Sequence, residues 1–227
     1  MSWLRIIGDV HGYHEKLVNL CNEAEYSLCV GDIGFSYNYL KVNLGLNSYL
    51  LGGNHDNYTR KTCCNGCDVC EKRGYTFPLQ TKHFLKDYGI LEIPEFKPIF
   101  YVRGAWSIDR DFRIAGVSWW EDEELTYQQC VHAIEKYEEI KPEFVVTHTC
   151  PRNVIPYIPF NSEFGDKIYQ TRTEQMLENM YEIHQPKIWI FGHFHKTWNK
   201  EFVHPSSSKI TNFFCLGELD YLDFNKE

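Results

Sequence analysis

The amino-acid sequence predicts an α/β fold, on two observations. Short apolar runs typical of β-strands alternate along the chain with segments whose apolar residues recur at helical spacing. Several of these runs also stop abruptly at side chains that can bind metal ions. Open α/β sheets place their functional sites at the carboxyl ends of strands. We therefore expect these side chains to lie together at one edge of the fold.

The first two strand-like runs enclose a helix-like segment. Residues 3–7 end just before Asp9 and His11, and residues 26–30 end just before Asp32. The chain is therefore predicted to begin with a β-α-β unit. Its helix would pack on the first strand through apolar side chains at helical spacing, namely Leu17, Leu20, Cys21 and Ala24.

A third apolar run, at residues 50–51, ends in two glycines followed by Asn54, His55 and Asp56. The glycines allow a sharp turn, because glycine adopts positive φ without a steric cost. An amide oxygen can ligate a metal, an imidazole can move protons near neutral pH, and a carboxylate can orient that imidazole. A polar turn between two strands is the structural alternative for this segment.

Residues 59–98 break the pattern and are predicted to form an insertion, such as a lid or cap, anchored by Phe84–Leu85 and Ile90–Leu91. Four closely spaced cysteines in it suit zinc binding or redox sensing, but structural zinc sites usually join two separated ligand pairs. The chain has nine cysteines and no recognisable secretion signal, which favours free thiols. We interpret the segment as a surface loop with reactive thiols at Cys63, Cys64, Cys67 and Cys70.

The second half of the chain contains further strand-like runs. Two of them end at imidazoles, because His148 follows one run directly, and His193 and His195 lie just after another. The runs at residues 99–102 and 113–119 would extend a second sheet. The predicted strands are 99–102, 113–119, 144–147, 188–191 and 213–217.

Two more helices are predicted in this half. Glu121–Glu124 opens a helix that runs to about residue 139, because acidic residues in a first helical turn favourably oppose the helix dipole. The alternative for these residues is an acidic lip near Trp119 and Trp120 that filters substrates by charge. The second helix can be capped by Thr171 or Thr173, and its apolar face consists of Met176, Leu177, Met180 and Ile183.

Length and composition are those of a folded protein of enzyme size. With 227 residues, of which 43% are hydrophobic, the chain can bury a large core, and a single domain over residues 1–227 is expected. The net charge of −8 disfavours a broad surface for nucleic acid, although a cationic metal site could still bind phosphate locally. We find no run long enough to span a bilayer and expect a soluble, cytoplasmic protein with no membrane partner.

The side chains that follow the strand-like runs share one chemistry, because they offer carboxylate, amide and imidazole donors. These donors suit two borderline transition metals better than calcium or magnesium. One such pair alone is weak support, since alternate residues share a face in many strands. The complete set in this order is strong support for a metal centre. The candidate ligands are Asp9, His11, Asp32, Asn54, His148, His193 and His195.

The order of these blocks resembles the signature of the calcineurin-like metallophosphoesterase superfamily. That signature consists of Asp-x-His, Gly-Asp, Gly-Asn-His-Asp/Glu, a lone His and Gly-His-x-His, and every block is present here between Asp9 and His195. The insertion at residues 59–98 carries no block. The resemblance implies a four-layer α-β-β-α sandwich with two central mixed β-sheets.

The resemblance also implies a role for each residue. His55 would protonate the leaving oxygen, with Asp56 holding its ring by a hydrogen bond. Two metal ions would lower the pKa of a bridging water, whose hydroxide would attack phosphorus in line. Asp32 would bridge the two ions. One ion would be held by Asp9, His11 and His195, and the other by Asn54, His148 and His193.

Manganese is the expected metal, with iron or zinc as alternatives, because affinity order alone favours zinc and cellular availability must decide. The implied activity is hydrolysis of phosphomonoester or phosphodiester bonds in a phosphorylated small molecule, a nucleotide or an oligonucleotide. A nuclease, a protein phosphatase and a metal-poor scaffold protein are the alternatives.

The sequence departs from the serine/threonine phosphatases of the superfamily, which carry an arginine after the Gly-Asp block and another before Gly-Asn-His. Neither arginine is present here, which weakens the protein-phosphatase alternative. A guanidinium is the usual group for gripping a phosphomonoester dianion. Arg60, Arg103 and Arg152 could substitute, but a charged surface residue is the simpler interpretation of each.

Overall fold

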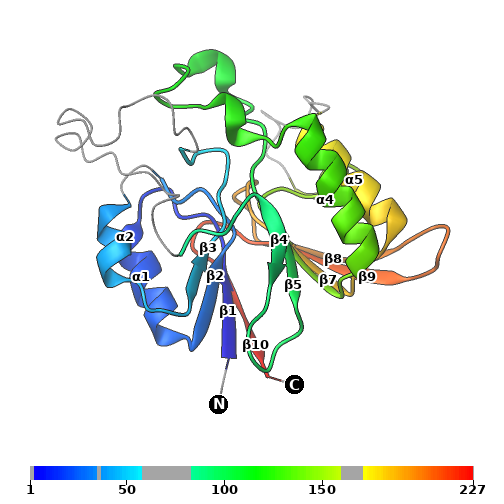
Figure 1. Ribbon diagram of the computed structural model, residues 1–227, viewed down its shortest axis with the longest axis horizontal. Coiled ribbons are helices and arrows are strands. Elements are labelled where there is room, and N and C mark those ends of the chain that lie inside the picture. The colour runs from blue at the N-terminus through cyan, green and yellow to red at the C-terminus, as the bar shows by residue number, and fades with distance from the viewer. Residues whose placement is uncertain (1–2, 35–36, 58–82, 160–170, 227) are drawn as a thin grey trace.

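Two mixed β-sheets lie at the centre of the computed structural model, with helices on their outer sides (Figure 1). The structure describes residues 3–34, 37–57, 83–159 and 171–226. Most of the expected insertion, including Cys63, Cys64, Cys67 and Cys70, lies outside the described residues. The cysteines within them, Cys21, Cys29, Cys130, Cys150 and Cys215, are buried free thiols.

The first sheet has the strand order β10-β1-β2-β3. β1 pairs in parallel with β2 and antiparallel with β10, so the sheet joins the two ends of the described chain. β2 and β3 are also parallel. The strands are β1 Trp3–Ile7, β2 Tyr26–Cys29, β3 Ser48–Leu50 and β10 Tyr221–Asn225.

The second sheet has six strands in the order β4-β5-β6-β7-β9-β8. Its central strands run parallel, and β4 and β8 are antiparallel edges. The β6 sequence Phe-Val-Val-Thr is buried throughout, as expected for a central strand covered on both faces. The strands are β4 Tyr88–Leu91, β5 Ile99–Val102, β6 Phe144–Thr147, β7 Ile188–Phe191, β8 Trp198–Val203 and β9 Ile210–Cys215.

Three clusters of buried side chains separate four layers. One cluster lies between the two sheets and includes Ile6 from β1 and Val146 from β6. A second packs helices α1 (His14–Glu23) and α2 (Asn38–Asn43) on the first sheet. The third packs helices α4 (Tyr127–Ile140) and α5 (Arg172–Ile183) on the second sheet. The α-β-β-α sandwich implied by the resemblance is therefore confirmed.

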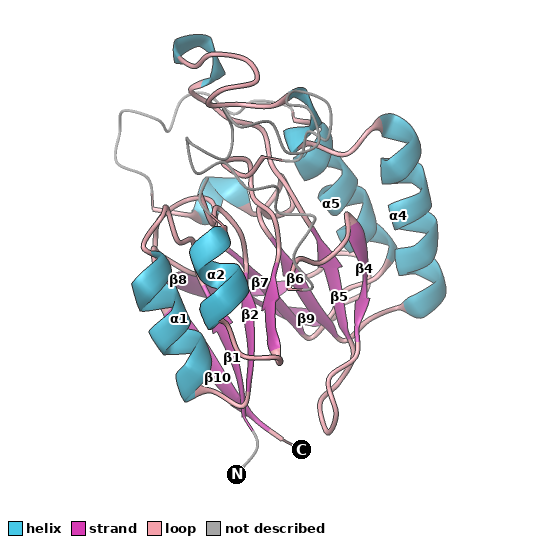
Figure 2. Cartoon of the chain, turned by 60° about the vertical axis from the view of Figure 1, so that its left-hand side comes forward, coloured by secondary structure: helices cyan, strands magenta, loops and turns pink. Residues whose placement is uncertain are grey.

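Loops at the carboxyl ends of β1, β2, β5, β6 and β7 lie on one side of both sheets, at the top of Figure 2. The loop from residue 103 to residue 126, which we call the arch, is the most prominent of them and contains the short 3₁₀ helices η2 (Arg110–Phe112) and η3 (Glu121–Glu123). A third 3₁₀ helix, η4 (Ile155–Tyr157), follows β6. In the part of the chain that the structure describes, no helix is long and apolar enough to cross a bilayer.

The arch corrects two predictions. Residues 113–119 do not form a strand; they form a turn closed by an isolated bridge between Ala115 and Trp119. The helix expected from residue 121 begins instead at Tyr127. Its cap is Thr126, whose side chain accepts a hydrogen bond from the backbone N–H of Gln129, and the Gln129 side chain in turn accepts from the Thr126 N–H.

The acidic run Glu121–Glu124 is not the first turn of α4, and its second half is not an exposed lip, although Glu121 is exposed. Glu123 is fully buried and Glu124 is 4% exposed. The Oε1 atom of Glu124 accepts hydrogen bonds from the backbone N–H and the hydroxyl of Thr173, in the first turn of α5. Glu124 therefore stabilises the amino end of a different helix. Thr171 is the residue that caps α5.

Candidate functional site

The five sequence blocks come together where strands of both sheets end. Asp9, Asp32 and Asn54 follow β1, β2 and β3 of the first sheet. His148 follows β6 of the second sheet, and the His193–His195 block follows β7. Residues separated by more than a hundred positions in the sequence therefore line one site.

The first group of polar atoms contains two carboxylates and two imidazoles. Asp9, His11, Asp32 and His195 each offer one potential ligand atom, and these atoms lie within 4.8 Å of one another. The Nε2 atoms of His11 and His195 are 2.8 Å apart. Asp32 Oδ2 lies 3.7 Å from the first of these nitrogens, and Asp9 Oδ2 lies 3.7 Å from the second. This group is a candidate metal-binding cluster.

The second group is centred on the amide oxygen of Asn54. That oxygen lies 2.9 Å from His148 Nε2 and 2.9 Å from His193 Nδ1. Asp32 Oδ1 lies 3.3 Å from the same nitrogen of His148. Asp32 therefore directs one carboxylate oxygen at each group.

The donor set of the second group fits a cation. His148 Nδ1 lies 3.0 Å from the carbonyl oxygen of Val30 and must donate a proton to it. Burial lowers the pKa of His148 to about 3, so its Nε2 atom is unprotonated and presents a lone pair. This lone pair faces the oxygens of Asn54 and Asp32, which are also acceptors. A cation among these atoms would turn their mutual repulsion into shared coordination.

The two central carboxylates point to the same conclusion. Among the described residues, Asp9 Oδ1 and Asp32 Oδ2 are buried and have no hydrogen-bond partner. Burial raises the pKa of both carboxyls well above the ordinary value for aspartate, and nearby carboxylates raise it further. A divalent cation would reverse this shift, because it supplies the opposite charge that the pair lacks.

The backbone is shaped to bring these side chains together. A Cβ on Gly53 would stand 2.6 Å from His148 Cε1 and even closer to Asp32, so only glycine allows this approach. Four candidate ligands also have left-handed backbone conformations, which non-glycine residues adopt at a cost. Their φ values are 46° at His11, 49° at Asp32, 68° at His193 and 51° at His195.

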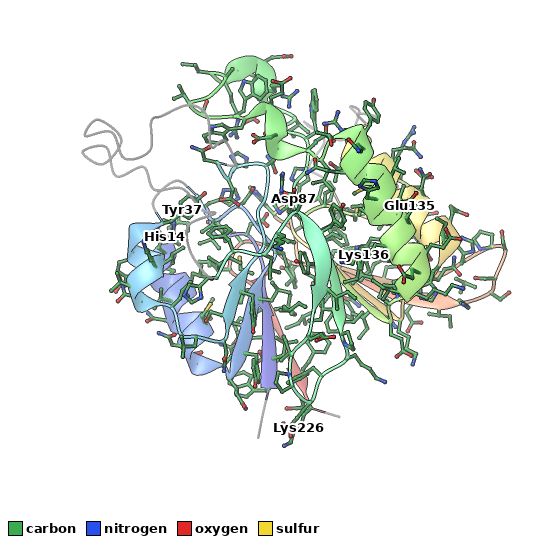
Figure 3. All side chains as sticks on the ribbon, in the orientation of Figure 1. His14, Tyr37, Asp87, Glu135, Lys136 and Lys226 are labelled. Atoms are coloured by element: carbon green, nitrogen blue, oxygen red, sulfur yellow. The ribbon has the colours of Figure 1, made fainter. Side chains whose placement is uncertain are left out.

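Asp56 does not hold the ring of His55, so that prediction is corrected. Its carboxylate instead accepts hydrogen bonds from the backbone N–H groups of Ile33, Gly34 and Gly53 and from the hydroxyl of Tyr37. Tyr37 lies at the start of α2, labelled in Figure 3. Asp56 therefore ties the turn that carries Asn54 to the loop that carries Asp32, because those N–H groups belong to both segments.

The ring of His55 faces an arginine that sequence reasoning did not single out. Arg113 Nη1 lies 2.7 Å from His55 Nδ1, and Nη2 lies 3.0 Å from Nε2. Burial and the charge of Arg113 lower the pKa of His55 to about 3. His55 Nε2 is also 3.9 Å from Asp32 Oδ2, which places the ring beside the first group.

Two further residues of the arch orient Asn54. Its Nδ2 atom donates to the hydroxyl oxygen of Ser107, and that hydroxyl donates to the buried carboxylate of Glu123 at 2.7 Å. Glu123 also accepts from Arg110 Nη2 at 2.6 Å. This chain of contacts leaves the amide oxygen of Asn54 directed at the two imidazoles. Ser107 lies in no recognisable motif, and Glu123 stood out in the sequence only as part of the acidic run, so no sequence signal identified their contact with Asn54.

The arginines considered from sequence have other contacts. Arg103 is 6% exposed and pairs with Asp87, which Figure 3 shows beside the top of β4, and with the carbonyl oxygen of Asp122. The charge of Arg152 lowers the pKa of Glu174, which is raised overall by burial. Arg60 lies outside the described residues.

Fold and site together define an α/β protein with a candidate metal centre where strands from two sheets end. Comparison with protein families identifies the family within this class. The profile of the calcineurin-like phosphoesterases matches residues 3–197, and the chain belongs to this family. The search of curated proteins finds no match.

One solved structure shares the fold at low sequence identity, and two others match with lower TM-scores. The chain is similar to phosphopantetheinyl hydrolase from Mycobacterium tuberculosis, at 13% identity and a TM-score of 0.52, over 96% of this chain and 90% of that one. A predicted phosphoesterase from Streptococcus pneumoniae matches at 11% identity and a TM-score of 0.38, over 99% and 85% of the two chains. Vacuolar protein sorting 29 from Cryptosporidium parvum matches at 14% identity and a TM-score of 0.36, over 96% and 74%.

Proposed function

We propose that this protein is a metal-dependent phosphoesterase that hydrolyses phosphomonoester or phosphodiester bonds. One observation supports the proposal most strongly: the unprotonated Nε2 atom of His148 faces the oxygens of Asn54 and Asp32 with no proton to share. A set of acceptors that converges in this way suits a cation, which would take the place of the proton that the raised pKa of Asp32 otherwise favours. Because the chain belongs to a phosphoesterase family, we propose that this cation acts in the hydrolysis of a phosphate ester.

In this proposal Asp32 bridges two ions, because its two carboxylate oxygens face the two groups. Bound divalent metals supply Lewis-acid stabilisation of phosphoryl oxygens and an acidified water. Manganese is our first choice of metal, with iron or zinc as alternatives. The ligands in the proposal are Asp9, His11 and His195 for one ion and Asn54, His148 and His193 for the other.

His55 is assigned the proton transfer to the leaving oxygen. Its ring lies at the edge of the first group, with Nε2 3.9 Å from Asp32 Oδ2 and its centroid 5.3 Å from that of His11. It is the one imidazole of the sequence blocks that the proposal leaves without a metal ion. A general acid must not be consumed as a ligand, and this placement meets that requirement. It must also carry a proton, which burial and the charge of Arg113 oppose by lowering the pKa of His55, and which a bound phosphoryl anion would favour by raising that pKa.

The proposed substrates are a phosphorylated small molecule, a nucleotide or an oligonucleotide, in the cytoplasm. The net charge of −8 disfavours a broad polyanion-binding surface and leaves phosphate recognition to the site, which supports the small phosphorylated substrates among these.

The test is hydrolysis of mono-aryl and bis-aryl phosphate esters by protein purified without chelators and supplied with Mn²⁺. Wild-type protein is expected to bind two ions and to hydrolyse at least one ester. Asp32→Ala should lose metal, because the bridging carboxylate is removed. His55→Ala should keep metal but lose most turnover, by about 100-fold or more, as expected for a general acid.

His132→Ala is the matched control, because His132 is exposed on α4. It should leave metal content and turnover unchanged. Wild-type protein that binds little metal and hydrolyses neither ester would argue for the metal-poor scaffold alternative. Unchanged turnover in His55→Ala would remove the general-acid role.

A further inference from the structure

Arg113 brings a guanidinium group to the candidate site from the arch. It follows η2, and its side chain is 17% exposed. Figure 1 shows the arch above the strands of both sheets. The terminal nitrogens of this guanidinium face the ring of His55, and a metal ion in the nearby first group would add positive charge beside them.

Two residues of the arch hold the guanidinium of Arg113 in place. Its Nε atom pairs with Asp109 Oδ1 at 2.6 Å, and Nη1 donates to the carbonyl oxygen of Ser118 at 2.9 Å. Both partners belong to the same arch. The group is therefore fixed in orientation, with its two terminal nitrogens presented to His55.

The contact with His55 does not supply a hydrogen-bond acceptor to both terminal nitrogens of the Arg113 guanidinium. An imidazole ring offers at most one acceptor nitrogen in any protonation state, because at least one of its nitrogens carries a proton. Arg113 approaches both nitrogens of His55, at 2.7 and 3.0 Å, so at most one contact is a hydrogen bond. The second contact sets one N–H donor against another. An anion with two oxygens would satisfy both terminal nitrogens where the imidazole satisfies one.

We propose that Arg113 binds the phosphoryl oxygens of the substrate. This inference rests on the proposed function and adds the group that recognises the anion. A guanidinium pairs with two oxygens of a phosphate through parallel N–H donors, and the Nε pair with Asp109 fixes the direction of that fork. The same contact lets Arg113 stabilise charge that develops on those oxygens during transfer.

Binding of inorganic phosphate to the Mn²⁺-loaded protein, followed by calorimetry, tests the inference without turnover. Arg113→Ala should weaken phosphate binding by about 10- to 100-fold, as expected for the loss of charged hydrogen bonds. Arg113→Lys should fall between this variant and wild type, because a lysine keeps the charge and loses the fork. Lys136→Ala is the charge-matched control, because Lys136 is exposed on α4, and it should bind phosphate as wild type does.

Steady-state kinetics give the second readout. Arg113→Ala should raise KM for the mono-aryl ester more than for the bis-aryl ester, because the monoester presents a dianionic group with more free oxygens to the fork. Metal content and circular dichroism, measured on every variant, show whether each protein is folded and loaded.

Two outcomes would overturn the inference. One is an unchanged phosphate affinity in Arg113→Ala. The other is a fall in kcat with no change in phosphate affinity or KM, which would make Arg113 a positioning residue for His55. If loaded wild-type protein hydrolyses no ester, the proposed function fails, and the phosphate titration still decides whether Arg113 binds the anion.

Discussion

Buried aspartates in this protein have two different environments. Asp9 and Asp32 retain oxygens that no described donor satisfies, whereas the carboxylate of Asp56 is surrounded by backbone N–H groups and the Tyr37 hydroxyl. The first environment fits a metal ion and the second makes a structural anchor. The sequence block Asn-His-Asp places a candidate ligand, a candidate acid and an anchor side by side.

Asp56→Asn should therefore destabilise the fold rather than remove a partner of His55. An asparagine turns one acceptor into a donor that would face backbone N–H groups, and the free energy of unfolding should fall by about 2–4 kcal/mol. Urea denaturation of the metal-free protein measures the change. Asp111→Asn, at an exposed position of the arch, is the control. A stability equal to that of wild type would show that the anchor is dispensable.

The candidate ligands could be predicted because each follows its strand within a few residues. Asp32, for example, lies three residues beyond the end of β2, and His148 directly follows β6. Arg113, Ser107 and Glu123 could not be predicted in the same way. They belong to a loop without regular spacing, and a loop places side chains by contacts between distant residues that periodicity does not encode.

At the scale of elements, the junction between the arch and the outer helices shows how local signals mislead. Four consecutive acidic residues predicted the start of a helix, but burial of Glu123 and Glu124 gives them partners in the arch and in α5. The weaker-looking Thr126–Gln129 pair is the real capping box. Tertiary contacts therefore override the preference of acidic residues for a first helical turn.

The first turn of α5 also contains a carboxyl group whose charged form is destabilised by burial. Glu174 is 7% exposed, and among the described residues its Oε2 atom has no hydrogen-bond partner. Burial raises its pKa to about 7. The folded state therefore holds a proton on Glu174 more tightly than the unfolded state, and stability due to this group is lost as pH rises from about 4.5 to about 7.

Glu174→Gln should remove that dependence. The variant should match wild type near pH 4, where the carboxyl is protonated in both states. At pH 8 its free energy of unfolding should be higher by up to about 3 kcal/mol, because no buried charge has to form. Chemical denaturation at both pH values measures this. A variant less stable than wild type at pH 8 would show that the Glu174 carboxylate is stabilised in the fold.

At the scale of the whole molecule, the sequence and its family resemblance were sufficient for the four layers and for the edge where the site lies. They did not predict the edge strands β8 and β10 or the order of the strands. β8 is largely exposed, so its sequence lacks the continuous apolar run of a central strand. Pairing between β1 and β10 joins segments more than two hundred residues apart, and no local pattern reports such a contact.

The candidate site depends on how the two sheets pack, because each sheet carries part of it. Ile190→Ala makes a cavity between the sheets, and Leu177→Ala makes one between α5 and the second sheet. Both residues are fully buried, so each variant should lose about 2–5 kcal/mol of stability.

Only the first cavity should loosen the placement of one ligand group against the other. Mn²⁺ affinity, measured by titration under conditions where both proteins are folded, should fall several-fold in Ile190→Ala and stay near wild type in Leu177→Ala. Equal affinities in the two variants would mean that sheet packing does not control the site.

The pairing of β1 with β10 has a consequence for synthesis of the protein on the ribosome. β1 leaves the exit tunnel long before β10 and must wait for residues 221–225 before its outer edge is covered. Asp9 and Asp32 likewise emerge long before His193 and His195. Since nascent chains grow by roughly 5–20 residues per second, about ten seconds or more pass in which this edge stays open to chaperones and to neighbouring chains.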